Sequence, residues 1–225
     1  KGYHLMAPPK ELTVDERGEL NLKSFSGFRE LVTKTFKMSD LTPIRCLFDN
    51  ASASIQTNDD TIFLRNDSGF EAFLLDGCYR DFILTGDLLY EGDGKCGLVL
   101  HLDEAGDGYY LSLDLLKGIV QIRAWGHKEE HEEKKVSEEA FYYDQLQAAH
   151  YIPDEGVHPF ELIAYEQYLE FSFHGRILLT LADDTFRSGR LGFYVEGGKM
   201  QVRNLELHHC RAPETKSYPE DMPNY

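Results

Sequence analysis

The stretch CGLVLHLDEAGDGYYLSLDLLKGIVQIRAW, residues 96–125, decides the fold. It holds three short runs, Cys96–Asp103, Tyr109–Leu115 and Ile119–Trp125, which are strongly apolar or alternate between apolar and polar residues, with glycine-containing turns between them. Alternation with a period of two is typical of β-strands that bury one face. The stretch therefore predicts three consecutive antiparallel strands joined by turns.

The same pattern runs along most of the chain, which predicts an all-β protein. Two further hairpins are expected, one pairing Glu11–Val14 with Glu19–Phe25 and the other pairing Ala53–Thr57 with Thr61–Arg65. The remaining strands are predicted at Phe70–Leu75, Tyr79–Tyr90, Phe160–Tyr165, Tyr168–Phe173, Ile177–Leu181, Arg190–Glu196 and Met200–His208. Regular short strands with Gly-rich turns indicate a sandwich or barrel and leave no place for βαβ units.

Two segments depart from the strand pattern. His127–Ala149 is rich in charge and in helix formers, which predicts a short surface helix or a mobile insertion. A second short helix is expected at Phe28–Phe36. All other helix is excluded from the prediction because nearly every apolar stretch alternates with a period of two.

A chain of 225 residues is long enough to form one large β domain. We expect a linker or hairpin over residues 1–30, a β-sandwich over residues 31–211 and a polar tail over residues 212–225. The charged residues of Glu11–Phe25 leave it little apolar face. That segment is therefore expected to dock on the flank of the sandwich, outside its core.

The charge balance narrows the choice of partners. The formal net charge is −16, which disfavours nucleic acid and anionic membrane surfaces because both are bound by excess Lys and Arg. No apolar run approaches the roughly 20 residues that a membrane helix needs. The charge does not exclude neutral ligands such as sugars. Buried free thiols are the favoured state of Cys46, Cys78, Cys96 and Cys210, and both extracellular and cytoplasmic locations stay open.

The sequence contains no motif that identifies a catalytic site. It lacks the G-x-S-x-G elbow, the P-loop, HExxH and the dinucleotide fingerprint. No pair of carboxylates is singled out for glycoside hydrolysis, and Asp183-Asp184 fits a turn. His127, Glu130, His131 and Glu132 form a metal candidate, but a solvated charge run is the commoner meaning of such a cluster. We therefore expect no catalytic residue, metal or cofactor in this chain, and leave open whether it is an enzyme.

The polar face of the central hairpin is the most informative candidate site. Alternation puts Tyr109, Leu111 and Leu113 on the core side of one strand, with Val120, Ile122 and Ala124 on the core side of the next. The opposite side then displays Tyr110, Asp114, Gln121, Arg123 and Trp125. An aromatic ring stacks on a sugar ring and planar polar groups bond its hydroxyls, so this face predicts carbohydrate binding. The alternative is a cross-strand Arg–Asp pair beside a half-buried Trp.

Two stretches resemble glycoside hydrolase families. APPKELTVDERGELNLKSF, Ala7–Phe25, resembles the segment by which family 32 enzymes leave their catalytic propeller and enter a C-terminal sandwich. The family's "PREL" phrase stands here as Pro9-Lys10-Glu11-Leu12. GKCGLVLHLDEAGDGYYLSLDLLKGIVQIRAWG and DDTFRSGRLGFYVEGGKMQVRNLELH, within Tyr79–His208, are similar to the concanavalin-type sandwich of fructan-binding modules of family 66.

The resemblance implies a concanavalin- or lectin-like jelly-roll sandwich that is an accessory part of an enzyme cleaving fructans or sucrose-type sugars. Family 32 catalysis depends on propeller motifs (WMNDPNG-like, RDP and a Glu beside Cys), and none of them occurs in this sequence. The expected partners are thus a neutral fructan-type oligo- or polysaccharide and a catalytic propeller. Two alternatives remain: a structural C-terminal domain that packs on the propeller without a ligand, and an independent jelly-roll glycosidase.

Overall fold

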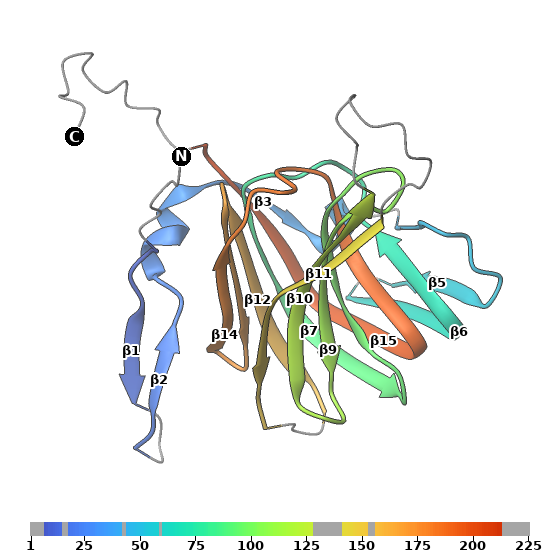
Figure 1. Cartoon of the computed structure of the whole chain (residues 1–225), viewed down its shortest axis with the longest axis horizontal. Coiled ribbons are helices and arrows are strands. Elements are labelled where there is room, and N and C mark those ends of the chain that lie inside the picture. The colour runs from blue at the N-terminus through green and yellow to red at the C-terminus, as the bar shows by residue number, and fades with distance from the viewer. Residues whose placement is uncertain are drawn as a thin grey trace.

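Antiparallel strands make up almost all of the computed structural model, which describes residues 7–14, 18–41, 44–58, 60–127, 141–152 and 156–212 (Figure 1). The strands are β1 Glu11–Val14, β2 Leu20–Lys23, β3 Val32–Lys37, β4 Arg45–Cys46, β5 Ala53–Thr57, β6 Thr61–Leu74, β7 Phe82–Gly92, β8 Cys96–Leu102, β9 Gly108–Asp114, β10 Ile119–His127, β11 Phe141–His150, β12 His158–Tyr165, β13 Tyr168–Phe173, β14 Arg176–Ala182 and β15 Arg190–Cys210. The 3₁₀ helices are η1 Ser26–Leu31 and η2 Met38–Asp40. The predicted all-β class is confirmed.

Two long strands, β6 and β15, join the two layers of a sandwich. The first part of β15 pairs with β8 and with the second part of β6, and its later part pairs with β7 and with the first part of β6. A break in the β6–β15 register lies between Glu196 and Gly198, where Gly197 has a φ of 66°. Gly69 of β6 has a φ of 73°. Glycine adopts this left-handed conformation without steric cost, so β15 crosses from one layer to the other at Gly197 and β6 crosses near Gly69.

The layers follow from this crossing. The first layer contains β11, β10, β9, β8, the first part of β15, the second part of β6 and β4. The second layer contains β5, the first part of β6, the later part of β15, β7, β12, β13 and β14, with β3 on the end of β15. Figure 1 shows the two layers facing each other across the body of the molecule.

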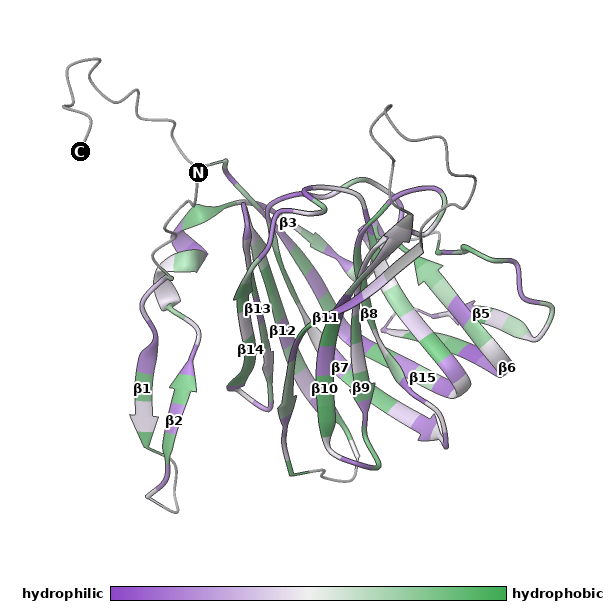
Figure 2. Cartoon of the chain, viewed as in Figure 1, coloured by the Kyte–Doolittle hydropathy of each residue, from purple (hydrophilic) through white to green (hydrophobic). Residues whose placement is uncertain are grey.

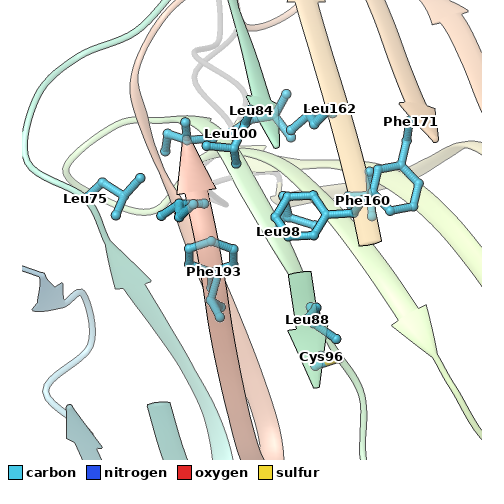
Figure 3. Close-up of a cluster of buried hydrophobic side chains, with 14 of the residues drawn as sticks. Leu75, Leu84, Leu88, Cys96, Leu98, Leu100, Phe160, Leu162, Phe171 and Phe193 are labelled. Carbon is cyan, nitrogen blue, oxygen red and sulfur yellow. The ribbon is translucent and has the colours of Figure 1, made fainter. Parts of the chain in front are cut away.

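The core lies between the layers and is filled by the alternate residues of each strand. Figure 3 shows Leu98 of β8 and Phe193 of β15 beside Phe160 and Leu162 of β12. The residues predicted for the core side of β9 and β10 all belong to this cluster: Tyr109, Leu111, Leu113, Val120, Ile122 and Ala124. The alternation in the sequence therefore predicted the inner and outer faces of the central strands correctly.

The helix predicted over His127–Ala149 is wrong where the structure describes that segment. Phe141–His150 is strand β11, which pairs with β10 from Ile119↔His150 to His127↔Phe141. Local helix propensity is a weak preference, and an open strand edge beside the segment overrides it. Residues 128–140, and with them most of the His/Glu cluster, lie outside the described residues.

The helix expected at Phe28–Phe36 is also only partly correct. The 3₁₀ helix η1 ends at Leu31, and β3 begins at the next residue. Phe28 is buried against the outer side of the second layer, where its ring stacks on Tyr168 at 5.9 Å between centroids. The threonines of β3 favour an extended backbone, and pairing with β15 stabilises it.

The N-terminal hairpin forms as predicted and is a separate two-stranded sheet, β1–β2, beside β14 (Figure 1). Lys10 anchors it by contacting the phenol of Tyr168 and the carboxylate of the buried Glu170. The expectation that it has little apolar face is wrong. Its register pairs Leu12 with Leu22 and Val14 with Leu20, and all four side chains are exposed. Figure 2 shows hydrophobic positions in green on both strands of this hairpin. Successive side chains of a strand point to opposite sides, so the apolar residues lie on one side of the hairpin although charged residues stand between them in the sequence.

All four cysteines are free thiols. Cys96 and Cys210 are buried, as expected for structural thiols, whereas Cys46 is half-buried and Cys78 is exposed. Burial raises the pKa of the Cys210 thiol to about 11, which keeps it protonated and inert. Within the described residues, no helix is long and apolar enough to span a membrane.

A buried histidine is expected to make stability fall on acidification. His101 is 2% exposed, and its ring nitrogens face the carbonyl oxygens of Phe186 (2.9 Å) and Arg80 (3.1 Å). Burial lowers the pKa of His101 below its usual 6.5 and outweighs those two carbonyls, which act in the opposite direction. Between the lowered pKa and about 6.5 the unfolded chain binds more protons, so the free energy of unfolding decreases as the pH falls through this window.

Urea unfolding between pH 7.5 and pH 5 measures this effect. In His101→Asn the pH dependence should be shallower, and asparagine tolerates the positive φ of 56° at this position. The exposed His150→Asn is the control and should keep the wild-type dependence. Equal pH dependence in wild type and His101→Asn would contradict the assignment.

Candidate functional site

The predicted hairpin of β9 and β10 is present, and its outer side is turned away from the core. The register pairs Tyr110 with Arg123 and Asp114 with Ile119. Tyr110, Gln121, Arg123 and Trp125 therefore come together on the first layer, while Asp114 lies at the turn end of β9. Asp114 is four positions along the strand from Tyr110, a distance of about 13 Å.

Asp114 serves the turn. Its Oδ1 accepts a hydrogen bond from the backbone N–H of Lys117 at 3.0 Å, and its Oδ2 lies 3.5 Å from the Lys117 ammonium. The Asp114 side chain is 10% exposed. The expectation that Asp114 shares one sugar ring with Trp125 therefore does not fit this geometry. The alternative of an Arg123–Asp114 pair does not fit it either.

Tyr110 is buried beneath the other aromatic residues of the site. It is 4% exposed, and its hydroxyl donates to the carbonyl of Gly106 at 2.7 Å. Its ring contacts Trp125 at 5.0 Å and Phe70 at 5.8 Å between centroids. Burial raises the pKa of the phenol well above its usual value, so it stays neutral. Tyr110 supports the aromatic residues above it and is covered by them.

Trp125 lies at the centre of a cluster of rings on this outer side. It is half-buried and lies nearly parallel to Phe70, at 6.2 Å and 26°, and edge-on to Tyr143 at 5.5 Å. Phe48 extends the row on the far side of Phe70, at 5.7 Å. We call Phe48, Phe70, Trp125 and Tyr143 the aromatic face; Tyr110 and Tyr194 lie beneath it.

Arg123 supplies the polar side of the aromatic face. Its guanidinium carbon lies 4.3 Å from the centroid of the Tyr143 ring, which is a cation–π contact. Its Nη2 donates to Gln121 Oε1 at 2.8 Å and lies 3.5 Å from Gln145 Oε1. The buried Nε has no partner among the described residues. The ring and the two amides hold the guanidinium plane in place beside Trp125.

A buried carboxylate fixes the loop that carries Phe48. Glu71 has no exposed surface and accepts hydrogen bonds from the backbone N–H groups of Leu47 (3.0 Å), Phe48 (2.9 Å) and Asn50 (2.7 Å). Charge-assisted bonds of this kind are about twice as strong as neutral ones. The loop between β4 and β5 is thereby held against β6, with Phe48 at its surface.

Sequence reasoning missed Phe48, Phe70, Tyr143 and Gln145. Phe48 and Phe70 lie far from Trp125 along the chain, and no local pattern links them. Tyr143 and Gln145 fell within the segment predicted as helix, although they alternate with Asp144 as strand residues do. That alternation was the available signal for a strand. In the sheet, β11 pairs Tyr143 with Trp125 and Gln145 with Arg123, which brings both residues to the site.

No family model and no curated protein matches the chain, whereas solved structures do. The carbohydrate-binding module CBM66 from Bacillus subtilis superposes with a TM-score of 0.60 at 15% identity, covering 75% of this chain and 97% of that one. The chain therefore has a lectin-like β-sandwich fold. A Bacillus subtilis protein of unknown function with a galectin-like fold gives 0.55 at 16% identity, covering 78% and 93%. The exoplasmic/lumenal domain of VIP36, in a Ca²⁺/Man3GlcNAc-bound form, gives 0.54 at 9%, covering 79% and 87%.

The alternation of side chains along the first layer explains why the aromatic face is a candidate site. Alternate residues of the first layer fill the core, so the remaining ones must lie on its outer side. There they include four aromatic rings, a guanidinium and two amides, and Phe48 and Tyr143 are 45% and 49% exposed. Single exposed apolar residues are common on protein surfaces, but a contiguous patch marks an interaction site.

Proposed function

We propose that the chain is a carbohydrate-binding module and that the aromatic face is its binding site. The observation that carries the proposal is the half-buried Trp125 beside the Arg123 guanidinium, which Tyr143 and Gln121 hold in place. Tryptophan and tyrosine rings offer an apolar surface to the C–H groups of a sugar ring, while Arg and Gln offer planar donors and acceptors to its hydroxyls. The fold it shares with a carbohydrate-binding module supports this choice.

The ligand in this proposal is a neutral fructan or sucrose-type glycan. The formal charge of −16 disfavours anionic polysaccharides, since the whole surface repels them. The choice of fructose units comes from the resemblance of the chain to fructan-binding modules. The parent protein in this proposal is a glycosidase whose catalytic propeller lies on another part of the chain or complex. No catalytic residue is assigned to the sandwich itself.

Affinity electrophoresis of the full chain tests the proposal. The protein should migrate more slowly in a gel that contains levan or inulin than in the same gel without polysaccharide. Mannan and a β-glucan in parallel gels separate fructan specificity from general glycan binding. A chain that none of these polysaccharides retards would overturn the proposal.

Arg123→Lys should weaken this binding about tenfold. Lysine keeps the charge but loses the planar group that stacks on Tyr143 and bonds Gln121, and a charged hydrogen bond is worth about 1.5–3 kcal/mol. Arg203→Lys is a matched control because Arg203 Nη2 also donates to the glutamine two residues earlier, Gln201, at 2.8 Å. Calorimetry with levan oligosaccharides measures both affinities. Equal loss in the two variants would contradict a specific role for Arg123.

A second candidate function is a structural domain that packs on a catalytic propeller. The exposed side of the β1–β2 hairpin favours it: Leu12, Val14, Leu20 and Leu22 are 64%, 64%, 67% and 49% exposed. Four such residues on one side of two short strands form a patch that a partner domain would cover. In this candidate, residues 1–30 are the linker that carries the patch and residues 31–211 are the sandwich.

A pull-down with a separately produced family 32 propeller tests the structural candidate. The wild-type chain should be retained, and the double variant Leu12→Ser/Leu20→Ser should not. Thr33→Ser on β3, outside the hairpin, is the control variant and should be retained like the wild-type chain. Retention of the double variant would remove the hairpin from the interface.

A further inference from the structure

A cavity of 510 Å³ lies at one end of the first layer, apart from the aromatic face. Leu74 of β6 and Leu102 of β8 line it and belong to the cluster of Tyr110, whereas Leu75, which also lines it, belongs to the central core. The cavity therefore lies at the end of the layer, and Leu74 and Leu102 reach it from the side that carries the aromatic face. None of the four rings of the aromatic face lines this cavity. Its volume is within the roughly 300–1,000 Å³ that is typical of small-molecule sites.

Two loose ion pairs stand on the rim of this cavity. Arg45 lies 3.7 Å from Asp76, and Arg190 lies 3.6 Å from Glu104. These separations exceed the 2.7–3.2 Å of a normal N–H···O hydrogen bond, and all four side chains are at least 42% exposed. The guanidinium N–H groups and carboxylate oxygens can therefore turn toward a molecule in the cavity.

The charges of the rim point to a neutral polyhydroxylated ligand. The two arginines are outnumbered by Asp76, Asp103 and Glu104, so the lining has a formal charge of −1 and does not attract anions. A sugar hydroxyl both donates and accepts, which suits a rim where guanidinium donors alternate with carboxylate acceptors. Leu74 and Leu102, which are 3% and 1% exposed, form the apolar base beneath this rim.

We infer that this cavity is a second carbohydrate site, which binds one or two sugar rings independently of the aromatic face. The class of ligand rests on the proposed function; the position of the site does not. A glycan held on the aromatic face and another held here would be bound by one module on one side of its sheet, and two linked sites raise the avidity for a branched or repeating polymer.

The chain contains a reporter for each site. Cys78 lines the cavity and is the only one of the four cysteines that is exposed, so its alkylation by N-ethylmaleimide reports on occupation of the cavity. Trp125 is the chain's only tryptophan, so its fluorescence reports on the aromatic face. The experiment follows both signals in the full chain with fructose, glucose, mannose, galactose and inulin oligosaccharides, each to about 50 mM, well above a millimolar Kd.

At least one of these sugars should slow alkylation of Cys78, about tenfold when its concentration is ten times its Kd. Arg190→Gln and Arg45→Gln should abolish this protection, whereas Arg187→Gln should not, because Arg187 pairs with Asp184 outside the cavity. The Arg45, Arg187 and Arg190 side chains are 70%, 62% and 42% exposed, so the variants are expected to fold. The second site is overturned if no sugar protects Cys78, or if protection is unchanged in both rim variants.

The two reporters also separate this inference from the proposed function. A change in Trp125 fluorescence without protection of Cys78 removes the second site and leaves the aromatic face. Protection of Cys78 without any response of Trp125, and with full affinity in Trp125→Ala, removes the aromatic face and leaves the second site.

Discussion

Trp125→Ala is expected to abolish detectable binding of levan oligosaccharides, a loss of at least about tenfold in affinity. Stacking of an aromatic ring contributes about 0.5–1.5 kcal/mol beyond the area it buries, and the lost area adds to this. Trp125 also supports its neighbours, since its ring contacts Phe70, Tyr110 and Tyr143. Removing it therefore takes away the central ring and loosens the others around it.

Phe63→Ala is the matched control for this variant. Phe63 is an aromatic residue on β6, 36% exposed, that lies outside the cluster of the aromatic face. Its removal should leave the affinity for levan oligosaccharides within about twofold of wild type, since substitutions away from a site have small effects. Calorimetry gives the affinities, and circular dichroism shows whether each variant is folded. A folded Trp125→Ala variant with wild-type affinity would place the sugar site elsewhere.

Glu71→Ala is expected to lower the free energy of unfolding by about 3–5 kcal/mol, near the upper limit for one substitution. The carboxylate accepts four backbone hydrogen bonds: those of Leu47, Phe48 and Asn50 in the loop, and that of Ala72 on its own strand. Each bond to a charged group contributes about 1.5–3 kcal/mol. Without the carboxylate these N–H groups either stay buried without a hydrogen-bond partner or become exposed to water as the loop detaches from β6.

Chemical denaturation of the wild type, Glu71→Ala and Glu196→Ala measures this effect. Glu196 follows Val195, the β15 partner of Glu71, but it is exposed, so its replacement should cost no more than about 0.5 kcal/mol. Loss of the loop should also displace Phe48 and weaken levan binding in buffer without denaturant, where the variant is still folded. A Glu71→Ala chain within 1 kcal/mol of wild type would show that water satisfies the loop N–H groups.

Much of the first layer follows from its own sequence. The alternation in β9 and β10 placed Leu111 and Ile122 inside and Tyr110 and Arg123 outside, and the short turn between the strands set their pairing. Side-chain direction has a period of two in any strand, and a tight turn fixes the register of a hairpin. Both are local properties, so inspection of the residues suffices. The same holds for the hairpins β1–β2 and β5–β6.

The tertiary structure alone decided the composition of the site. Phe70 reaches Trp125 because β6 and β15 cross between the layers near Gly197, and Tyr143 reaches it because β11 adds to the edge of β10. Such pairings between distant segments are selected by burial of the whole core and by completion of backbone hydrogen bonds, and no local period encodes them. The sequence by itself determined which residues of the central hairpin face outward. Only the folding of the sheet over its core determined which other rings meet them there.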